Sequence, residues 1–420
     1  MLKRILTLST GMIVGSLLAM GLIHVVQLSG IMGDRDVSKS ARYYGQVVEL
    51  VRERYVDADR VDPEALTRDA LRGMLRSLDP HSNFLAASDY SQLQEDIDSK
   101  FGGIGVQIEF REGFVVVIAP ISGTPGERAG ILRGDRVLAI NGESMVGSSL
   151  NEVVAQMRGK PGDPVEITFE RQGEEEPVEI TVVREVIKVK SVTDVMMLSE
   201  EIGYLRIAQF SAPTAEELRD AMQQLANDGM RSLVIDVRNN PGGLLSSAKE
   251  VLDPFFEQGE LMVYTEGRTA ADREEFRSTS SSRLWNYPTV VLINSGSASA
   301  AEILAGALQD TGKAHVVGET SFGKGSVQSL IRLRAGEGIR LTTGRYYMPS
   351  GVTVHEVGVI PDEEVVMSPE DDLNVALQRS RRDLSDPAEF EARFGFAPIP
   401  DLQLEAALAH LRESADEAQP

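Results

Sequence analysis

The sequence predicts a multidomain protein of mixed helix and sheet, in which an α/β core follows a smaller β-rich domain. Three patterns predict this fold class. Amphipathic helical stretches fill residues 40–97, short strand-like runs divided by glycines fill 101–186, and apolar strands alternate with helices from residue 202 onward. A chain of 420 residues is long enough for two or three domains with a substantial core.

The charge balance and the absence of cysteine exclude several classes of protein. The chain carries 42 basic and 64 acidic residues, a formal net charge of −22. A surface that acidic repels phosphate backbones, so we expect no nucleic-acid partner. Because there is no cysteine, disulfides, thiolate metal sites and a cysteine nucleophile are all excluded. We predict no metal site and no cofactor.

The N-terminus has the pattern of an export signal. Lys3 and Arg4 precede an apolar run, residues 5–26, that contains no acid or base except His24. A helix over this run would be about 33 Å long, enough to cross a bilayer core. The basic start directs the following chain across the membrane. We therefore predict a signal peptide or membrane anchor over residues 1–30 and a periplasmic protein, either released or tethered by residues 5–26.

Residues 38–98 form a predicted helical arm. The run YYGQVVELVRERYV has an apolar stripe, and DPEALTRDALRGMLRSL repeats it after a proline suited to the first helical turn. A third helix, SDYSQLQEDI, is predicted to begin with Ser88 or Asp89 as its cap. The sequence leaves open whether this arm flanks a core or forms an association surface.

Residues 101–186 are predicted to form the β-rich domain. Its glycine loop FGGIG leads into a strand rather than a helix, so it is a poor phosphate-binding loop. Free backbone amides beside an exposed strand edge suit the C-terminal carboxylate of a peptide that adds as an extra strand. The candidate residues for such a site are Gly102, Gly103, Ile104 and Gly105.

Two glycine-rich turns follow buried strands of the α/β part. LVIDVRNN leads into RNNPGGLL, residues 238–245, and TVVLIN leads into NSGSASAAEILAG, residues 294–306. Open α/β sheets bind ligands where a strand ends and a helix begins. A serine there meets free amides that can stabilise a developing oxyanion. The alternative is a capped helix and a tight connection without chemistry.

A serine nucleophile needs a base, and Lys324 is a better candidate than any of the five histidines. None of the histidines lies in a glycine-framed turn, although the sequence leaves a Ser-His-Asp triad open. Lys324 lies between two glycines in TSFGKGSVQS, and in an extended segment it would share a face with Ser326 and Gln328. Burial would lower its pKa and let it accept the serine proton, with Gln328 orienting the amine. The alternative is a solvated surface lysine.

These blocks resemble a known family. NSGSASAAEILAGALQD followed by GETSFGKGSVQ is similar to the signature of the carboxyl-terminal processing (tail-specific) serine proteases, and LDPHSNFL, RNNPGGLL and YYMPSGVTVHEVGVIPD also look like family blocks. GGIGVQI, SGTPGERAGI, GDRVLAINGE and the helix before MRGKPGD resemble a PDZ domain of the bacterial, circularly permuted type. The resemblance implies a ClpP/crotonase-like protease core, residues 187–367 with part of 70–100, an inserted PDZ domain, 101–186, and a C-terminal helical region, 368–420.

The resemblance also assigns roles to particular residues. It implies that Ser299 is the nucleophile, Lys324 the base and Gln328 the supporting residue. It places the oxyanion hole at the amide of Ala300 and one amide of the pair Gly242 and Gly243, of which we favour Gly243. Arg158 matches an arginine through which family PDZ domains engage the active site. The chain departs from the family at Ala301, where serine is frequent, without losing an essential group.

The predicted function is therefore that of an exported Ser-Lys endopeptidase that selects envelope proteins by their C-termini. The resemblance leaves room for an activating adaptor protein, and we expect self-association through the terminal helical regions. Two alternatives stay open: a PDZ-bearing scaffold or pseudoprotease, which the intact serine and lysine argue against, and a crotonase-type acyl-transfer enzyme. The second would not explain export, the PDZ-like insert or the lysine.

Overall fold

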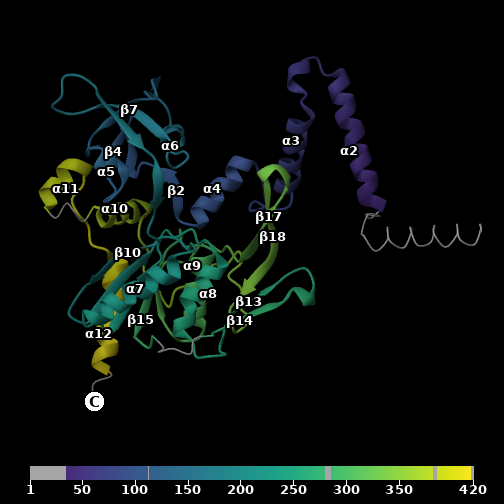
Figure 1. The fold of residues 1–420 in the computed structure, drawn as a ribbon. Coiled ribbons are helices and arrows are strands. Elements are labelled where there is room, and N and C mark those ends of the chain that lie inside the picture. Colours follow the sequence, from purple (N-terminus) through teal and green to yellow (C-terminus); the bar gives the residue numbers. More distant parts are fainter. Residues whose placement is uncertain (1–34, 112, 280–284, 382–385, 418–420) are drawn as a thin grey trace, which may run out of the picture. The chain divides into compact units, whose positions relative to one another are not determined.

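The computed structural model describes residues 35–111, 113–279, 285–381 and 386–417 (Figure 1). The predicted export segment lies outside these residues. Within the described ranges, no helix is long and apolar enough to cross a membrane. The chain divides into two compact units, residues 1–84 and 85–420.

The first unit contains two helices, α2 (Arg35–Arg54) and α3 (Pro63–Arg76). Pro63 stands in the first turn of α3 as predicted, and the Asp62 carboxylate accepts a hydrogen bond from the Ala65 amide at 2.9 Å. No residue of α2 is buried, although its sequence is amphipathic. Val37, Tyr43 and Leu50 are more than half exposed. This helix therefore has an apolar face that the described residues of its own unit, including α3, leave exposed. The chain passes into the second unit through β1 (Asn83–Leu85).

The second unit begins with α4 (Ala87–Ile97), which starts two or three residues earlier than predicted. Its N-cap is Ala86 and not Ser88 or Asp89, both of which lie inside the first turn. Propensity located this helix correctly but not its first residue, which is the least reliable feature of such a prediction. The predicted domain boundaries stay a prediction.

The β-rich domain follows and has its own apolar core. In the sequence this domain lies between β2 (Lys100–Gly103) and β9 (Glu185–Lys188), which pair with each other as an antiparallel ribbon. The domain also contains two short helices, α5 (Pro125–Arg128) and α6 (Leu150–Met157). Its antiparallel sheet has the order β3 (Val106–Arg111), β4 (Phe114–Pro120), β5 (Arg136–Ile140), β7 (Pro164–Glu170), β8 (Val178–Val183), with β6 (Glu143–Ser144) paired to β5. Strand β3 is an edge strand, as the predicted peptide site requires. The core contains Val137, Val153 and Phe169, all fully buried.

The α/β part is built on a second, mostly parallel sheet. Its order is β10 (Val192–Met197), β11 (Ile202–Ile207), β12 (Ser232–Asp236), β15 (Thr289–Ile293), β16 (His315–Gly318), β19 (Glu363–Glu364). Only the β10–β11 pair is antiparallel. Strands β12 and β15 are neighbours, so the turns that follow them lie at the same edge of the sheet. This adjacency brings together the two glycine-rich turns.

Helices cover both faces of this sheet. One face packs against α7 (Thr214–Asn227), α8 (Leu245–Leu252) and α9 (Ala300–Asp310) in the largest core of the protein. The other face packs against α12 (Leu402–Glu417), whose Ala407 and Leu411 contact Tyr204, Val290 and Leu292. After residue 368 the described part of the chain forms α10 (Pro369–Ser380), α11 (Pro387–Phe394) and α12, in the region expected to be helical.

An antiparallel sheet completes the unit. Its strands are β13 (Leu261–Glu266), β14 (Glu274–Arg277), β17 (Ser326–Arg332) and β18 (Gly338–Tyr347). Strand β17 begins two residues after Lys324, and Tyr346 of β18 is buried in the main core. This sheet therefore supplies the segment that carries the predicted base.

Candidate active site

Ser299 lies between the end of β15 and the start of α9, in a strained backbone conformation. Its φ of 56° and ψ of −113° are rare for a residue with a side chain, and such conformations cost about 1–3 kcal/mol. Two hydrogen bonds fix it: the Ser299 amide donates to Glu302 Oε2 at 2.7 Å, and its carbonyl accepts from the Ile303 amide at 2.9 Å. Strain held by its surroundings is frequent at functional sites. The turn presents a half-buried hydroxyl at a helix N-terminus.

The other serines of this turn have structural positions. Ser297 is fully buried, and its hydroxyl donates to the Val237 carbonyl at 2.8 Å and accepts from the Asn294 amide at 3.0 Å. Ser295 is exposed. The Asn294 carboxamide binds the neighbouring turn, accepting from the Asn239 amide at 2.8 Å. The crowding of small hydroxyl residues therefore serves to attach this turn to the turn after β12.

Lys324 stands close to the nucleophile turn through a shared carboxylate. Its amide donates to Glu302 Oε2 at 2.9 Å, the same oxygen that accepts from the Ser299 amide. Burial lowers the pKa of Lys324, and Arg340 lowers it further, while Glu302 opposes both. The lysine forms no ion pair with any described residue. A half-buried ammonium without a paired carboxylate is in the environment that favours a neutral amine.

Glu302 is the residue that sequence reasoning missed. It is fully buried, and besides the two amides its Oε1 accepts from the Ser321 hydroxyl at 2.6 Å and the Gly323 amide at 2.7 Å. The available signal was a carboxylate inside the apolar run AAEILAGAL, since an unpaired acid is almost never fully buried. Glu302 thus joins the nucleophile turn to the lysine segment.

Tyr346 makes a second connection between these segments. Its hydroxyl lies 2.7 Å from the Lys324 carbonyl oxygen and 3.1 Å from the Ser299 carbonyl oxygen. Burial raises the pKa of this phenol well above its ordinary value, so it stays a proton donor. In the sequence, Tyr346 is distinguished only as the first residue of the family-like block YYMPSGVTVHEVGVIPD.

We expect Glu302→Gln to lower both stability and turnover. A glutamine offers one acceptor oxygen where the carboxylate has two, so buried donors on both segments lose a partner at about 1–3 kcal/mol each. Urea unfolding and kcat measured on the same preparation test this. Glu405→Gln is the matched control, because Glu405 lies in the first turn of α12 but is exposed. Equal stability of Glu302→Gln and the wild type would show that the carboxylate does not hold the site together.

Gln328 lies on the same side of β17 as Ser326. The bulge at this point places its extra residue, Thr343, in the partner strand β18, since Val327 pairs with Gly344 and Gln328 with Thr342. The Gln328 amide nitrogen donates to Ser326 Oγ at 2.8 Å and to the Ser326 carbonyl at 3.2 Å. Its carboxamide is thus held by Ser326, and any support of Lys324 stays a prediction.

Gly242 of the first turn packs against the nucleophile. A Cβ at Gly242 would lie 2.7 Å from Ser299 Cβ and 2.9 Å from the Ala300 nitrogen, whereas a Cβ at Gly243 would meet the backbone of Phe210. Gly242 and Gly243 have φ of 93° and 145°, so both need glycine. The Gly242 amide donates to Asn240 Oδ1 at 2.8 Å, whereas the Gly243 and Ala300 amides find no acceptor among the described residues. These two adjoining turns therefore each contain an amide that is free to donate, and their role as an oxyanion hole stays a prediction.

The predicted carboxylate loop of the β-rich domain is partly strand. Gly102 and Gly103 end β2, and Ile104 and Gly105 connect it to the edge strand β3. Ile104 is buried, and its carbonyl accepts from the Gly126 amide at 2.7 Å. Gly105 has a φ of 74° and packs against Thr124. The connection is therefore tightly built beside an open strand edge.

Arg158 follows α6, next to this connection. Its guanidinium carbon lies 4.4 Å from the centre of the Phe101 ring, a cation–π distance. Arg158 Nη1 is buried and has no hydrogen-bond partner among the described residues. The residue after it, Gly159, donates its amide to the Gly102 carbonyl at 3.1 Å. Arg158 is thus fixed to the start of the carboxylate loop.

One histidine lies next to the predicted base. His355 packs its backbone against Gly325, next to Lys324, and its Nδ1 is buried without a partner in the described part of the chain.

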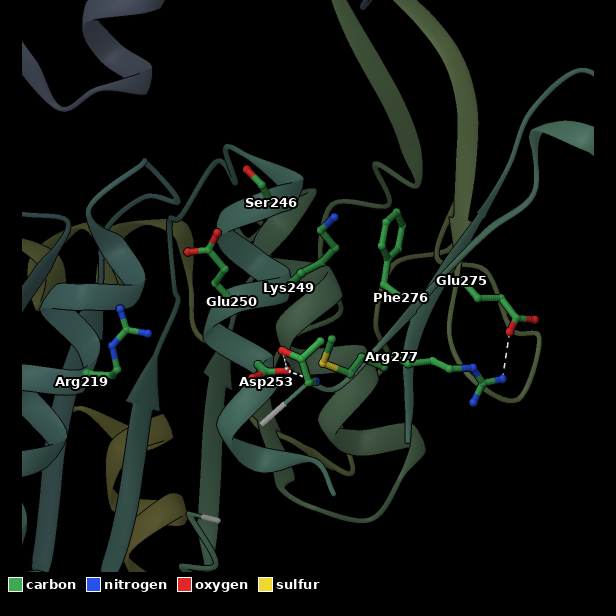
Figure 2. Close-up of a pocket in the computed structure, with 10 residues that line it drawn as sticks. Arg219, Ser246, Lys249, Glu250, Asp253, Glu275, Phe276 and Arg277 are labelled. Carbon is green, nitrogen blue, oxygen red and sulfur yellow. Dashed lines mark hydrogen bonds and ion pairs between the residues drawn. The ribbon is translucent and has the colours of Figure 1, made fainter. Parts of the chain in front are cut away.

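A cavity of about 530 Å³ lies between α8 and the β13–β14 pair (Figure 2). Lys249 lies 3.8 Å from the Phe276 ring centre there, and no predicted site residue lines the cavity. No cluster of the described residues could hold a metal ion.

Comparison with known proteins decides the family. A model of peptidase family S41 matches residues 201–365, and a PDZ-domain model matches 116–171. The carboxy-terminal-processing protease of Bartonella bacilliformis is 39% identical over 354 residues, which cover 83% of this chain and 80% of that protein. The chain belongs to peptidase family S41. This S41 peptidase is therefore a serine-type endopeptidase of the carboxy-terminal processing class with a PDZ domain.

A second sequence relative agrees with this assignment. The carboxy-terminal processing protease CtpB of Bacillus subtilis is 35% identical, covering 78% of this chain and 68% of its own. A solved photosystem II D1 C-terminal processing protease is 29% identical and covers 76% of this chain and 91% of its own, with a TM-score of 0.45. The family models, the two sequence relatives and the mixed helix and sheet structure confirm the predicted family, fold class and enzyme class.

Proposed function

We propose that this S41 peptidase hydrolyses peptide bonds with a Ser-Lys dyad of Ser299 and Lys324. The observation that carries the proposal is the shared acceptor: Glu302 Oε2 binds the amides of both residues. A common oxygen keeps the two segments in contact, and the lowered pKa of the lysine suits a base. A PDZ-bearing scaffold does not require a lysine of lowered pKa, and neither does a crotonase-type acyl-transfer enzyme.

The chemistry follows from these positions. Neutral Lys324 accepts the proton of the Ser299 hydroxyl as its oxygen attacks the substrate carbonyl. The amides of Gly243 and Ala300 then donate to the oxyanion, and the protonated lysine returns its proton to the leaving amine. Water completes the reaction by hydrolysing the acyl-enzyme with the same base. In this scheme Gln328 orients the amine by accepting a hydrogen bond from Lys324 Nζ at its Oε1, while its Nε2 keeps the bonds to Ser326.

Substrate selection is proposed to lie in the PDZ domain. A protein tail would add along β3 and place its carboxylate at the amides of residues 102–105. Arg158 would couple this occupied domain to the protease core, since it is anchored to the loop through Phe101 and its buried Nη1 has no hydrogen-bond partner in the part of the chain that the structure describes. An adaptor protein that favours the bound arrangement would act through the same surface.

Export and self-association complete the proposal. Residues 1–30 would direct the chain to the periplasm for processing or degradation of envelope proteins, with residues 5–26 as the tether if they are retained. The apolar face of α2, which includes Val37, Tyr43 and Leu50, would pair with a second copy. The short C-terminal helices would extend that association.

Amidation of a substrate's C-terminus is expected to slow its cleavage several-fold. An amide lacks the charge that the loop amides bind, and appended acidic residues would lose the apolar contacts of the groove. Paired peptides that differ only in the terminal group should be compared by kcat/KM. Arg158→Ala should slow both peptides and leave the preference between them. Equal rates for the free and amidated tails would rule out selection through this loop.

A further inference from the structure

A buried cluster of charges ties the C-terminal segment to the turn that carries Gly243. Arg238, the first residue of that turn, is 1% exposed. Its Nη1 and Nη2 donate to the two carboxylate oxygens of Asp401 at 2.7 and 2.8 Å. Such a two-point arginine–carboxylate pair fixes orientation as well as distance. Asp401 lies 163 positions further along the chain, immediately before α12.

The charges of this cluster depend on one another. Arg238 also binds the fully buried Asp236, with Nη2 to Oδ2 at 2.7 Å, and Arg379 of α10 donates to the same oxygen at 2.8 Å. Burial alone would raise the pKa of Asp236, but Arg238 and Arg379 hold it well below its ordinary value. Two carboxylates thus face these two guanidinium groups. Without the Asp401 charge, Asp236 alone would face the two guanidinium groups. The excess positive charge would then favour a movement of Arg238 toward water.

The residues after Arg238 attach directly to the nucleophile turn: the Asn239 amide donates to Asn294 Oδ1 at 2.8 Å, and Asn294 Nδ2 donates to Asn239 Oδ1 at 3.1 Å. Asn240 holds the far end: its Nδ2 donates to the Ile207 carbonyl at 2.7 Å, and its Oδ1 accepts from the Gly242 amide. The Asn240 carbonyl accepts from the Ala298 amide at 2.9 Å, which attaches the turn to the nucleophile. A shift of Arg238 would be transmitted along three residues to the Gly242–Gly243 peptide.

We propose that Asp401 is a positioning residue for the reaction, which holds Arg238 and thereby fixes the Gly243 amide beside Ser299. This inference rests on the proposed oxyanion hole. It gives the C-terminal segment a part in turnover and not only in covering the sheet. Asp401 touches no reacting atom and acts only through the Gly243 amide. Because that amide would bind the oxyanion, the effect of Asp401 is expected in the transition state and not in substrate binding.

The test compares Asp401→Asn with the wild type. Asparagine keeps the cap that Asp401 Oδ1 provides to the Leu404 amide but removes the charge. We expect kcat to fall about 10-fold or more, as for a misplaced oxyanion donor, with KM within about two-fold. A peptide aldehyde, whose Ser299 adduct carries the tetrahedral oxygen, should lose affinity in step with kcat, while the product peptide should bind as before.

Two further variants make the result decisive. Asp401→Glu keeps the charge and should retain more turnover than asparagine, so it also serves if Asp401→Asn folds poorly. Asp386→Asn is the matched control, because Asp386 caps α11 through the Ala388 amide and has the same chemistry without Arg238. Unchanged kcat and aldehyde affinity in Asp401→Asn, with Ser299-dependent cleavage intact, would overturn this inference alone. If the Ser299→Ala variant cleaves at the wild-type rate, the proposed site and the inference are both wrong.

Discussion

Replacing Ser299 with alanine is expected to abolish proteolysis while leaving the fold intact. Loss of a nucleophile that acts with a base costs about four orders of magnitude or more in kcat. The fold should persist because alanine has a Cβ like serine, so the strain at φ 56° is unchanged. The backbone bond from residue 299 to Glu302 and the carbonyl bond to Ile303 do not involve the hydroxyl. Peptide cleavage and thermal unfolding should be measured together.

Ser297→Ala is the matched comparison, two positions away in the same turn. Its hydroxyl is buried and bonded on both sides, so its removal leaves the Asn294 amide without an acceptor among the described residues and takes one of two donors from the Val237 carbonyl. We expect a loss of about 1–3 kcal/mol in unfolding free energy with most activity retained. The reverse pattern, in which Ser297→Ala is inactive and Ser299→Ala cleaves, would transfer the nucleophile to Ser297.

The elements around the site could be predicted because their signals are local. The buried strands β12 and β15, the glycine turns after them and the start of α9 all follow from runs of apolar residues, glycines and small hydroxyl residues. The need for glycine at residues 242 and 243 could be read in the same way, since a tight turn demands positive φ. Adjacent parallel strands then bring the two turns together.

The connections between segments could not be predicted from local patterns. Glu302 looks like a helix-cap residue in the sequence, yet its four donors come from its own turn and from residues 321–324. Tyr346 and Asp401 reach the site from 22 and 163 positions away. Gln328 shares a side with Ser326, as the extended pattern predicted, but its bond to Ser326 Oγ could not be read from that pattern. These features depend on which segments meet, and single-sequence periodicity does not carry that information.

Lys324→Arg is expected to be as inactive as Lys324→Ala, with a loss of several orders of magnitude in kcat. Arginine keeps the positive charge but does not deprotonate in proteins, so it cannot accept the Ser299 proton. A surface lysine that contributed only charge would tolerate this change. Cleavage of one peptide by the wild type and both variants, with unfolding monitored in parallel, distinguishes the two roles.

The pH dependence of the wild type gives an independent measure of the base. The neutral lysine is the active form, so kcat/KM should rise with pH and level off above the pKa of Lys324 in the free enzyme. Burial and Arg340 lower that pKa, so the midpoint should lie below the ordinary lysine value of about 10.4. His355 is the control, because it packs against Gly325 and a histidine base would place the midpoint near about 6.5. We expect His355→Ala to keep the wild-type midpoint. A midpoint that disappears in His355→Ala while Lys324→Arg stays active would assign the proton transfer to the histidine, because only the group that loses the proton can set the pH at which the rate changes.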